Sequence, residues 1–132
     1  MRNKTLPVLT PLNAWFWTSG RDGRLSILRC CACSAWIHPP APICPECLGR
    51  DLNPEPVSEH GVIEGFTVNH QPWNPHDVVP YVIAIVSLND CPGVRLTTNI
   101  VDSSPDLIRI GMPVRVAFEQ CEDVWLPLFT PV

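Results

Sequence analysis

The residues best suited to chemistry in this chain are four cysteines arranged as two Cys-x-x-Cys pairs. Cys30 and Cys33 form the first pair, Cys44 and Cys47 form the second, and ten residues separate the two pairs. Each tight turn can present two thiolates to one ion, and two such turns complete the tetrahedral four-sulfur site that zinc takes in structural ribbons. The spacing therefore predicts one structural zinc ion held by these four side chains. The alternative is that the cysteines form disulfides or are buried separately.

A shell of four cysteines is closed, which limits what the metal can do. Catalytic zinc sites usually keep a water molecule in the fourth position beside three protein ligands. We therefore expect the zinc to fold the ribbon, with on the order of 10–16 kcal/mol of binding free energy. His38 and Cys31 are interpreted as non-ligands. Ser34 and Leu48 stand directly after the two pairs, where glycine is common, so weakened backbone hydrogen bonds to sulfur are expected.

A second polar cluster lies in residues 69–77. His70, His76 and Asp77 could combine a general base with an orienting carboxylate. The favoured interpretation is a polar loop between two strands, with histidines that simply face water. The sequence has no nucleophile-elbow, phosphate-loop or dinucleotide-binding motif. These residues therefore do not by themselves predict an enzyme that acts alone.

The segment before the first cysteine pair is predicted to form a helix over residues 10–20. Thr10 is expected to cap its start, Pro11 fits the first helical position, and Gly20 fits the left-handed position at its end. The apolar side chains of this helix either pack on their own domain or dock onto a partner, because exposed aromatic residues are common anchors of interfaces. The candidate partner-interface residues are Leu12, Trp15, Phe16, Trp17 and, farther along the chain, Trp73.

The rest of the chain is predicted to be mainly β structure. Residues 25–30 are expected to form a strand that leads into the first cysteine pair. Residues 49–60 are polar and contain proline, and they are interpreted as a linker. The run from Tyr81 to Leu88 is almost continuously apolar, as expected of a strand buried on both faces. Pro127 in the last predicted strand suits a sheet edge.

The order of these elements predicts a fold class. Five strands follow the linker, with one short helical turn between the third and the fourth. This outline matches a five-stranded Greek-key barrel of the OB type. The predicted fold is therefore mainly β, with an N-terminal helix and a zinc ribbon followed by a five-stranded OB-fold barrel. The expected units are a helical arm over residues 1–24, the zinc ribbon over residues 25–56 and the barrel over residues 57–132.

Composition and charge disfavour several classes of function. The 132-residue chain contains no stretch resembling a signal peptide and none apolar enough to span a membrane. Seven cysteines, an odd number, argue against complete disulfide pairing and favour a reducing cytoplasm. Residues 1–50 carry a net charge of +4 and residues 51–132 a net charge of −8. The acidic barrel disfavours a nucleic-acid-binding zinc-ribbon and OB module, which is the alternative function because both folds often bind nucleic acids.

Both halves of the chain resemble one family, and the motifs occur in the same order. The family is the acyl-CoA-associated OB-fold proteins with a rubredoxin-like zinc ribbon, long described as a domain of unknown function. The resemblance covers about residues 10–130. It rests on Phe16-Trp17, Gly23-Arg24-Leu25, Cys44-Pro45-Glu46-Cys47, Gly61-Val62-Ile63, Pro80-Tyr81-Val82 and Leu126-Pro127-Leu128-Phe129.

The resemblance implies a helper protein. Members of this family accompany thiolase-like proteins, including thiolases and the lipid-transfer-protein-type aldolases of steroid side-chain degradation. It implies a non-catalytic accessory subunit in a hetero-oligomer with a thiolase-like or aldolase partner that acts on acyl-CoA. The most specific expectation is the retro-aldol step of steroid side-chain breakdown. By position, the family transfers only the four cysteines, as metal ligands.

An acyl-CoA ligand suggests a further set of candidate residues. Arg21, Arg24 and Arg29 follow the aromatic helix closely in the sequence. This clustering makes them candidate contacts for the phosphates of coenzyme A. The alternative is that they are ordinary solvated surface arginines.

Overall fold

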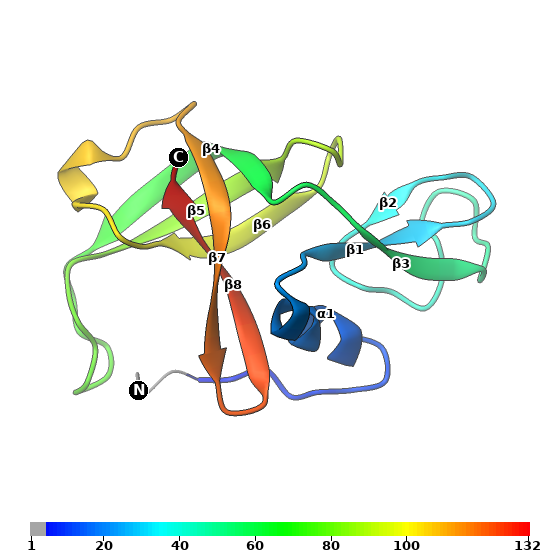
Figure 1. Cartoon of the computed structure of the whole chain (residues 1–132), viewed down its shortest axis with the longest axis horizontal. Helices are drawn as coiled ribbons and strands as arrows, with labels where there is room; N and C mark the ends of the chain where they lie inside the picture. Colours follow the sequence, from blue (N-terminus) through cyan, green and yellow to red (C-terminus); the bar gives the residue numbers. More distant parts are fainter. Residues whose placement is uncertain (1–4) are drawn as a thin grey trace.

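The computed structural model describes residues 5–132 and contains an N-terminal arm, a small sheet and a β-barrel (Figure 1). The arm consists of α1 (Ala14–Thr18) and the 3₁₀ helix η1 (Ser19–Asp22). The small sheet consists of β1 (Ser26–Cys30), β2 (Trp36–Ile37) and β3 (Leu52–Pro56). The barrel consists of β4 (His60–Asn69), β5 (Tyr81–Leu88), β6 (Arg95–Ile100), the 3₁₀ helix η2 (Pro105–Leu107), β7 (Pro113–Cys121) and β8 (Val124–Pro131). This mainly β architecture confirms the predicted fold class.

The helix of the arm is shorter than predicted. Asn13, not Thr10, is the residue before the first helical turn. Its side-chain Oδ1 accepts a hydrogen bond of 2.8 Å from the backbone N–H of Thr10, and its Nδ2 donates one of 3.2 Å to the carbonyl of Val8. These bonds hold the chain in a turn ahead of the helix, because an asparagine side chain competes with helical backbone pairing. No helix among residues 5–132 is long and apolar enough to cross a lipid bilayer.

Gly20 does not end the helix, contrary to the prediction. The left-handed conformation is found at Gly23, which has a φ of 70°. Gly20 is instead buried inside η1, where a β-carbon would lie 2.5 Å from Cδ1 of Phe118 and 2.6 Å from Cβ of Trp125. The absence of a side chain at this position therefore lets the arm lie directly against β7 and β8.

The small sheet has the strand order β2-β1-β3, which contradicts the prediction of a linker over residues 49–60. Five residues of β3 pair antiparallel with β1, with Pro54 opposite Leu28 and Pro56 opposite Ser26. Proline lacks a backbone N–H and is confined in sheets to positions such as edge strands. Because β3 is an edge of this sheet, its prolines are compatible with a strand.

The barrel is closed, with the strand order β4-β5-β6-β8-β7 and β7 paired with β4. η2 lies between the third and fourth strands, as predicted. The prediction that Pro127 marks an edge is wrong, since β8 pairs with β7 along its length and in parallel with β6 at one position, Ile100 opposite Phe129. The carbonyl of Pro127 also accepts a hydrogen bond of 2.8 Å from Thr98 Oγ1 on β6. The proline is accommodated here because the pairing between β6 and β8 is so short.

Strand β5 is buried on one face only, contrary to the prediction. Its buried residues alternate along the strand, and Ile85 on the opposite face is 43% exposed. In an antiparallel barrel each strand turns one face to the core and the other to water, whereas burial on both faces is typical of parallel sheets covered by helices. An apolar run alone does not distinguish these two settings.

One core connects the three parts of the chain. The buried cluster of the barrel also contains Phe16 of the arm, Leu25 just before β1 and Ile27 within β1. A smaller cluster within the ribbon contains Leu28, and Trp15 packs against both clusters. Ile27 and Leu28 are neighbours in β1 and face opposite sides. Ile27 faces the barrel core and Leu28 faces the cysteines.

Candidate metal centre and partner surface

The four predicted ligands converge on one point. The Sγ atoms of Cys30, Cys33, Cys44 and Cys47 all lie within 4.8 Å of one another. The distance from Cys30 Sγ to Cys47 Sγ is 3.6 Å, and so is that from Cys33 Sγ to Cys44 Sγ. All four are free cysteines, which excludes the disulfide alternative. Zinc–sulfur bonds of about 2.3 Å in a tetrahedron place sulfur atoms about 3.8 Å apart, so the cluster has the size of a zinc site.

The two knuckles form without glycine after the second cysteine. Ser34 and Leu48 adopt the left-handed conformation themselves, with φ of 65° and 63°. Their backbone N–H groups donate to the carbonyls of Cys30 and Cys44, at 3.0 and 2.9 Å. Backbone N–H groups one residue further on, such as that of Gly49, still donate to sulfur. The backbone N–H groups of Ala35 and Gly49 act to lower the pKa of Cys33 and Cys47, respectively.

The thiols influence one another's pKa. The pKa of Cys30 is lowered to about 7, chiefly by the backbone N–H of Cys33. The backbone N–H of Ala35 acts to lower the pKa of Cys33, but burial and hydrogen bonds to the neighbouring thiols raise it to about 12. The Cys30 thiol therefore ionises readily, whereas the Cys33 thiol resists a second negative charge at the same site. A divalent cation relieves this repulsion by binding all four groups as thiolates.

The donor set therefore fits one zinc ion in a closed tetrahedral shell. When bound, zinc supplies structural cross-linking of the ribbon and leaves no coordination position for a substrate. Cys31 is exposed and lies outside the four-cysteine cluster, as expected. Cys91 and Cys121 are buried in the barrel, and burial raises the pKa of Cys91 to about 11. These two thiols are poorly suited to nucleophilic chemistry.

His38 lies between the ribbon and the arm. Its ring centroid is 5.1 Å from that of Phe16, and its buried Nδ1 has no hydrogen-bond partner among the described residues. Burial lowers the pKa of His38, because an apolar setting disfavours the charged imidazolium. The histidine therefore acts as a neutral packing residue at this junction.

The lowered pKa of His38 predicts a pH-dependent stability. The unfolded chain binds the proton more tightly than the folded protein does, so stability is lost progressively as the pH falls below about 6.5. His38→Phe keeps a planar ring beside Phe16 but cannot be protonated. We expect its unfolding free energy to fall less than that of the wild type between pH 7.5 and 5.5 in urea titrations, with zinc content measured at each pH. Equal pH dependence of the two proteins would contradict this prediction.

The structure divides the candidate interface residues into two groups. Phe16 is only 5% exposed and belongs to the core, so it is not available to a partner. Trp15 and Trp17 are partly buried against the same core. Leu12 is 41% exposed on the arm, and Trp73 is 74% exposed in the loop between β4 and β5. Among the candidate residues, those open to a partner therefore lie on the arm and in the β4–β5 loop.

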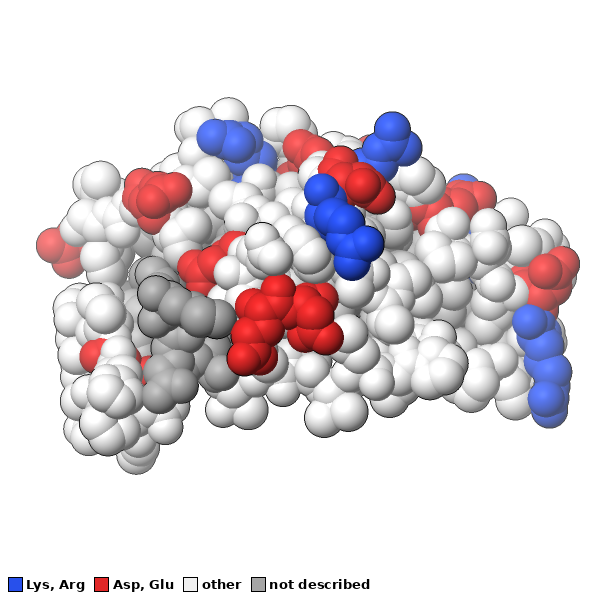
Figure 2. All heavy atoms as spheres, turned by 60° about the horizontal axis from the view of Figure 1, so that its bottom comes forward, with Lys and Arg blue, Asp and Glu red and all other residues white. Residues whose placement is uncertain are grey.

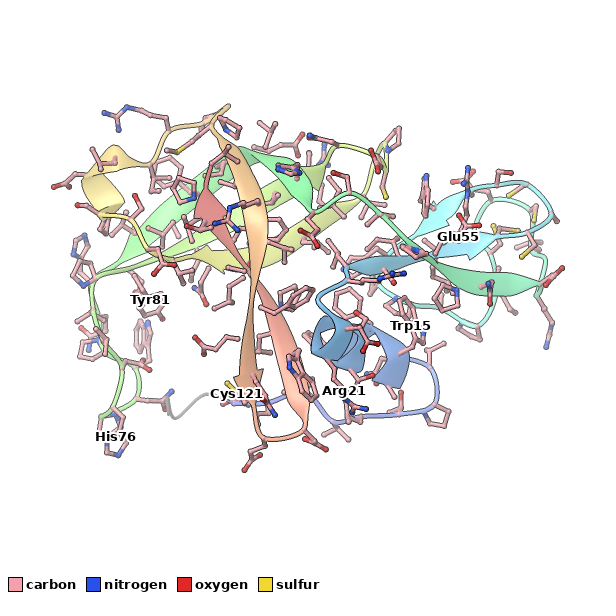
Figure 3. The ribbon with its side chains drawn as sticks, in the orientation of Figure 1. Trp15, Arg21, Glu55, His76, Tyr81 and Cys121 are labelled. Atoms are coloured by element: carbon pink, nitrogen blue, oxygen red, sulfur yellow. The ribbon has the colours of Figure 1, made fainter. Side chains whose placement is uncertain are left out.

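Two of the three candidate arginines, Arg21 and Arg29, contact different parts of the chain. The guanidinium of Arg21 lies 5.1 Å from the ring centroid of Trp125 on β8, whereas that of Arg29 lies 4.3 Å from the ring centroid of Trp36. Arg29 also forms an ion pair of 3.2 Å with Glu55. Figure 3 shows Arg21 beside the β7–β8 hairpin and Glu55 in the ribbon, well apart. On the face drawn in Figure 2, basic side chains are scattered and acidic ones lie between them.

The polar loop borders a cavity of about 480 Å³. His76 and Asp77 are among the residues that line this cavity, and His70 is not. Asp77 Oδ2 accepts a hydrogen bond of 3.1 Å from the backbone N–H of Asn74, so it caps a turn of the loop. No hydrogen bond among the described residues joins Asp77 to a histidine. The structure therefore does not assemble the base and carboxylate pair that the sequence raised as an alternative.

Two lining residues of this cavity were missed by sequence analysis. Tyr81 opens β5, and Asp102 follows β6 with a left-handed φ of 57°. They line the same cavity because β5 and β6 pair antiparallel with Val82 opposite Ile100. This placement depends on strand register, which the sequence does not display. A non-glycine residue with positive φ is a local signal, but it is visible only in the structure.

Comparison with family models assigns both halves of the chain. Residues 17–53 match the ChsH2 rubredoxin-like zinc ribbon domain, and residues 54–119 match the ChsH2 C-terminal OB-fold domain. The chain belongs to the ChsH2 family. The metal centre described above lies inside the matched ribbon, so the family model and the geometry agree on one zinc site.

Three relatives show how the ChsH2-family chain compares with longer and shorter proteins. It is 37% identical over 126 residues to the "Probable enoyl-CoA hydratase alpha subunit" of Thermomonospora curvata, covering 95% of the chain and 39% of that protein. It is 33% identical to the "3-oxo-4,17-pregnadiene-20-carboxyl-CoA hydratase alpha subunit" of Mycobacterium tuberculosis, covering 89% of the chain and 37% of that protein. It is 36% identical to a "DUF35 domain-containing scaffold protein" of Methanothermobacter thermautotrophicus, covering 72% of the chain and 71% of that protein. The chain thus spans less than two-fifths of the length of the two hydratase subunits.

Two solved structures share the fold. A chain of the "Ltp2-ChsH2(DUF35) aldolase" has a TM-score of 0.86 at 37% identity, covering 96% of this chain and 98% of that one. A DUF35-family protein of unknown function from Sulfolobus solfataricus has a TM-score of 0.66 at 13% identity, covering 92% of this chain and 86% of that one. The ChsH2-family chain is therefore homologous to subunits of hydratases and to a chain of an aldolase complex.

Proposed function

We propose that this chain is a non-catalytic subunit that completes a thiolase-like enzyme acting on acyl-CoA. The reaction proposed for the complex is the retro-aldol step of steroid side-chain degradation. In that reaction the bond between the α- and β-carbons of a β-hydroxyacyl thioester breaks and gives a ketone and a shorter thioester. The partner subunit would carry the groups that move the protons, and this chain would support it.

The observation that carries the proposal is the similarity to a chain of the Ltp2-ChsH2(DUF35) aldolase. The similarity extends over 98% of that chain with a TM-score of 0.86, so arm, ribbon and barrel are all included. The relative named for a pregnadiene carboxyl-CoA hydratase supports an acyl-CoA substrate with a steroid skeleton. The closed four-cysteine shell supports a structural role for the metal.

The surfaces proposed for the partner are the exposed parts of the candidate interface. Trp73 at 74% exposure and Leu12 at 41% exposure offer apolar side chains to a partner, and large aromatic residues are frequent energetic centres of interfaces. Arg21 and Arg24 are exposed and remain proposed contacts for coenzyme A phosphates. Arg29 is the weakest of the three because Glu55 and Trp36 already bind its guanidinium.

Affinity capture from native extract followed by a reconstituted assay tests this function. We expect a thiolase-like protein to co-purify with the tagged, zinc-loaded chain. The purified pair should cleave a β-hydroxyacyl-CoA carrying a steroid side chain, and the partner alone should be much less active or insoluble. Recovery of no thiolase-like protein, or brisk turnover by this chain alone, would overturn the proposal.

Trp73→Ala then tests the proposed interface. We expect it to weaken binding of the partner by about thirtyfold, corresponding to about 2 kcal/mol, without unfolding the chain. Leu48→Ala is the matched control, because Leu48 is also 74% exposed but lies in the second knuckle of the ribbon. Titrations of both variants by calorimetry compare them directly. Equal affinities for the two variants would remove Trp73 from the interface.

A further inference from the structure

The cavity beside the β4–β5 loop has a composition that the proposed function does not use. It has a volume of about 480 Å³ and lies between the loop, the start of β5 and the turn that follows β6. Figure 1 shows this loop and η2 at the end of the barrel farthest from the ribbon. In Figure 3, Tyr81 lies at the base of the loop and His76 near its tip. The cavity is thus remote from the metal centre.

The charges around this cavity are one-sided. Asp77 and Asp102 both line it, and no lysine or arginine is found among its lining residues in the described part of the chain. Neither carboxylate takes part in an ion pair among residues 5–132. Arg109 is not among the lining residues, and its Nη1 donates to the carbonyls of Asp106 and Ile108 at 2.9 and 3.0 Å. Among residues 5–132, no lysine or arginine therefore pairs with the two carboxylates.

Two aromatic side chains complete the cavity. Trp73 and Tyr81 line it together with the carboxylates. The face of an aromatic ring attracts a cation within about 6 Å, and it does so most strongly for tryptophan and for guanidinium groups. Carboxylates add charge-assisted hydrogen bonds, which arginine can make in pairs. A cavity lined by both kinds of group is complementary to a positively charged, planar or compact side chain.

The rim of the cavity points to a protein as the source of that cation. Trp73 and Val78 are each 74% exposed, so exposed apolar side chains line the cavity together with the carboxylates. Interface centres commonly have this anatomy, with tryptophan and arginine over-represented among the residues that contribute most to binding. A free small cation would leave this apolar rim in water.

We propose that this cavity receives an arginine or lysine side chain of the partner subunit. The proposal rests on the proposed function, in which such a partner exists, and adds the chemistry by which the loop recognises it. The guanidinium or ammonium group lies between the two carboxylates and the two rings, and Trp73 and Val78 pack on the partner around it.

The cavity can be tested without the partner. The probe is N-acetyl-arginine amide, titrated into the full-length, zinc-loaded chain while the indole N–H of Trp73 and the backbone N–H of Asp102 are followed by NMR. We expect saturable shifts with a Kd on the order of 1 mM, as suits a small ligand. N-acetyl-citrulline amide has nearly the same shape without the charge, and we expect it to bind at least tenfold more weakly.

Isosteric variants locate the site. Asp77→Asn keeps an oxygen that can cap Asn74, and Asp102→Asn suits the left-handed backbone, because asparagine tolerates that conformation. We expect the double variant to bind the arginine probe at least tenfold more weakly. Asp123→Asn removes one charge from the distant β7–β8 turn and should leave binding unchanged. Equal binding of citrulline, or equal weakening by Asp123→Asn, would overturn the cation site.

Measurements with the partner then distinguish this proposal from the proposed function. The Asp77→Asn, Asp102→Asn double variant is expected to weaken the complex at least tenfold, and the loss should shrink at high salt. Binding of the arginine probe with no loss of complex affinity would overturn the assignment of the cavity to the partner, and the proposed function would stand. Absence of a thiolase-like partner would refute the proposed function and, with it, the partner as the source of the cation.

Discussion

Replacing Cys44 with serine is expected to release the zinc ion and unfold the ribbon while the barrel strands stay folded. Cys44 is fully buried and, with Cys30, supplies half of the four-residue ribbon core that also contains Leu28 and Ile37. Such a core cannot hold the sheet alone, because domains of this size need a metal or disulfides. Losing one thiolate removes most of a metal-binding free energy of about 10–16 kcal/mol. Zinc content per chain and hydrogen exchange of residues 26–56 against residues 60–131 measure the two effects.

Cys31→Ser is the matched control for this experiment. Cys31 adjoins a metal ligand but is exposed and outside the cluster, and its backbone N–H donates a hydrogen bond of 2.8 Å to the carbonyl of Asp51. Serine keeps that bond, so one zinc per chain and unchanged exchange are expected. Retention of a protected ribbon in Cys44→Ser would show that the metal is dispensable. Unfolding of the barrel as well would show that Leu25 and Ile27 tie the two parts into a single cooperative unit.

The metal centre could be predicted because its signal is local. Two residues separate the cysteines of each pair, and a knuckle brings them together whatever the rest of the chain does. The structure confirms all four as a cluster. The order of the five barrel strands and the position of η2 were predicted for a related reason, because alternation and turn residues are visible within a few positions.

Features that depend on a neighbour in space were not predictable from the sequence. Residues 52–56 contain two prolines and read as a linker, yet they form a strand because β1 lies beside them with an unpaired edge. The exposure of Ile85 follows from closure of the barrel, which leaves one face of β5 in water. Residue type limits whether a segment can form a strand and how far it is buried, but the neighbouring strand in the fold determines both.

The candidate partner surface also combines features that the sequence predicts locally with features that depend on neighbours in space. The sequence made Trp15 and Phe16 equal candidates for the interface, and it did not indicate that Phe16 would be buried in the core shared with the barrel. Proximity in sequence grouped Arg21 with Arg29, yet the chain turns between them and each stacks on a different tryptophan. Trp73 needed no such information, because a tryptophan in a polar loop has little apolar surface nearby to cover it.

Replacing Gly20 with alanine is expected to destabilise the fold by about 1–3 kcal/mol. The backbone at Gly20 is helical, so helix propensity alone predicts a gain of about 1 kcal/mol. The contacts predict the opposite sign, because the new methyl group would lie 2.6 Å from Cβ of Trp125 and 2.8 Å from Cγ of Phe118. Neither atom is the free end of a flexible chain, so the arm or the β7–β8 hairpin must move. Urea unfolding followed by circular dichroism measures the sign.

Gly65→Ala supplies the control, since a β-carbon at Gly65 has no atom within 4 Å. We expect its stability to stay within about 0.5 kcal/mol of the wild type. A stable Gly20→Ala protein would mean that the arm can leave the barrel without loss. The arm carries Leu12, Trp15 and the Arg21 guanidinium that stacks on Trp125, so its attachment decides whether these side chains meet a partner as one fixed surface. Destabilisation by Gly20→Ala would show that the same packing that completes the core also holds the proposed partner surface in place.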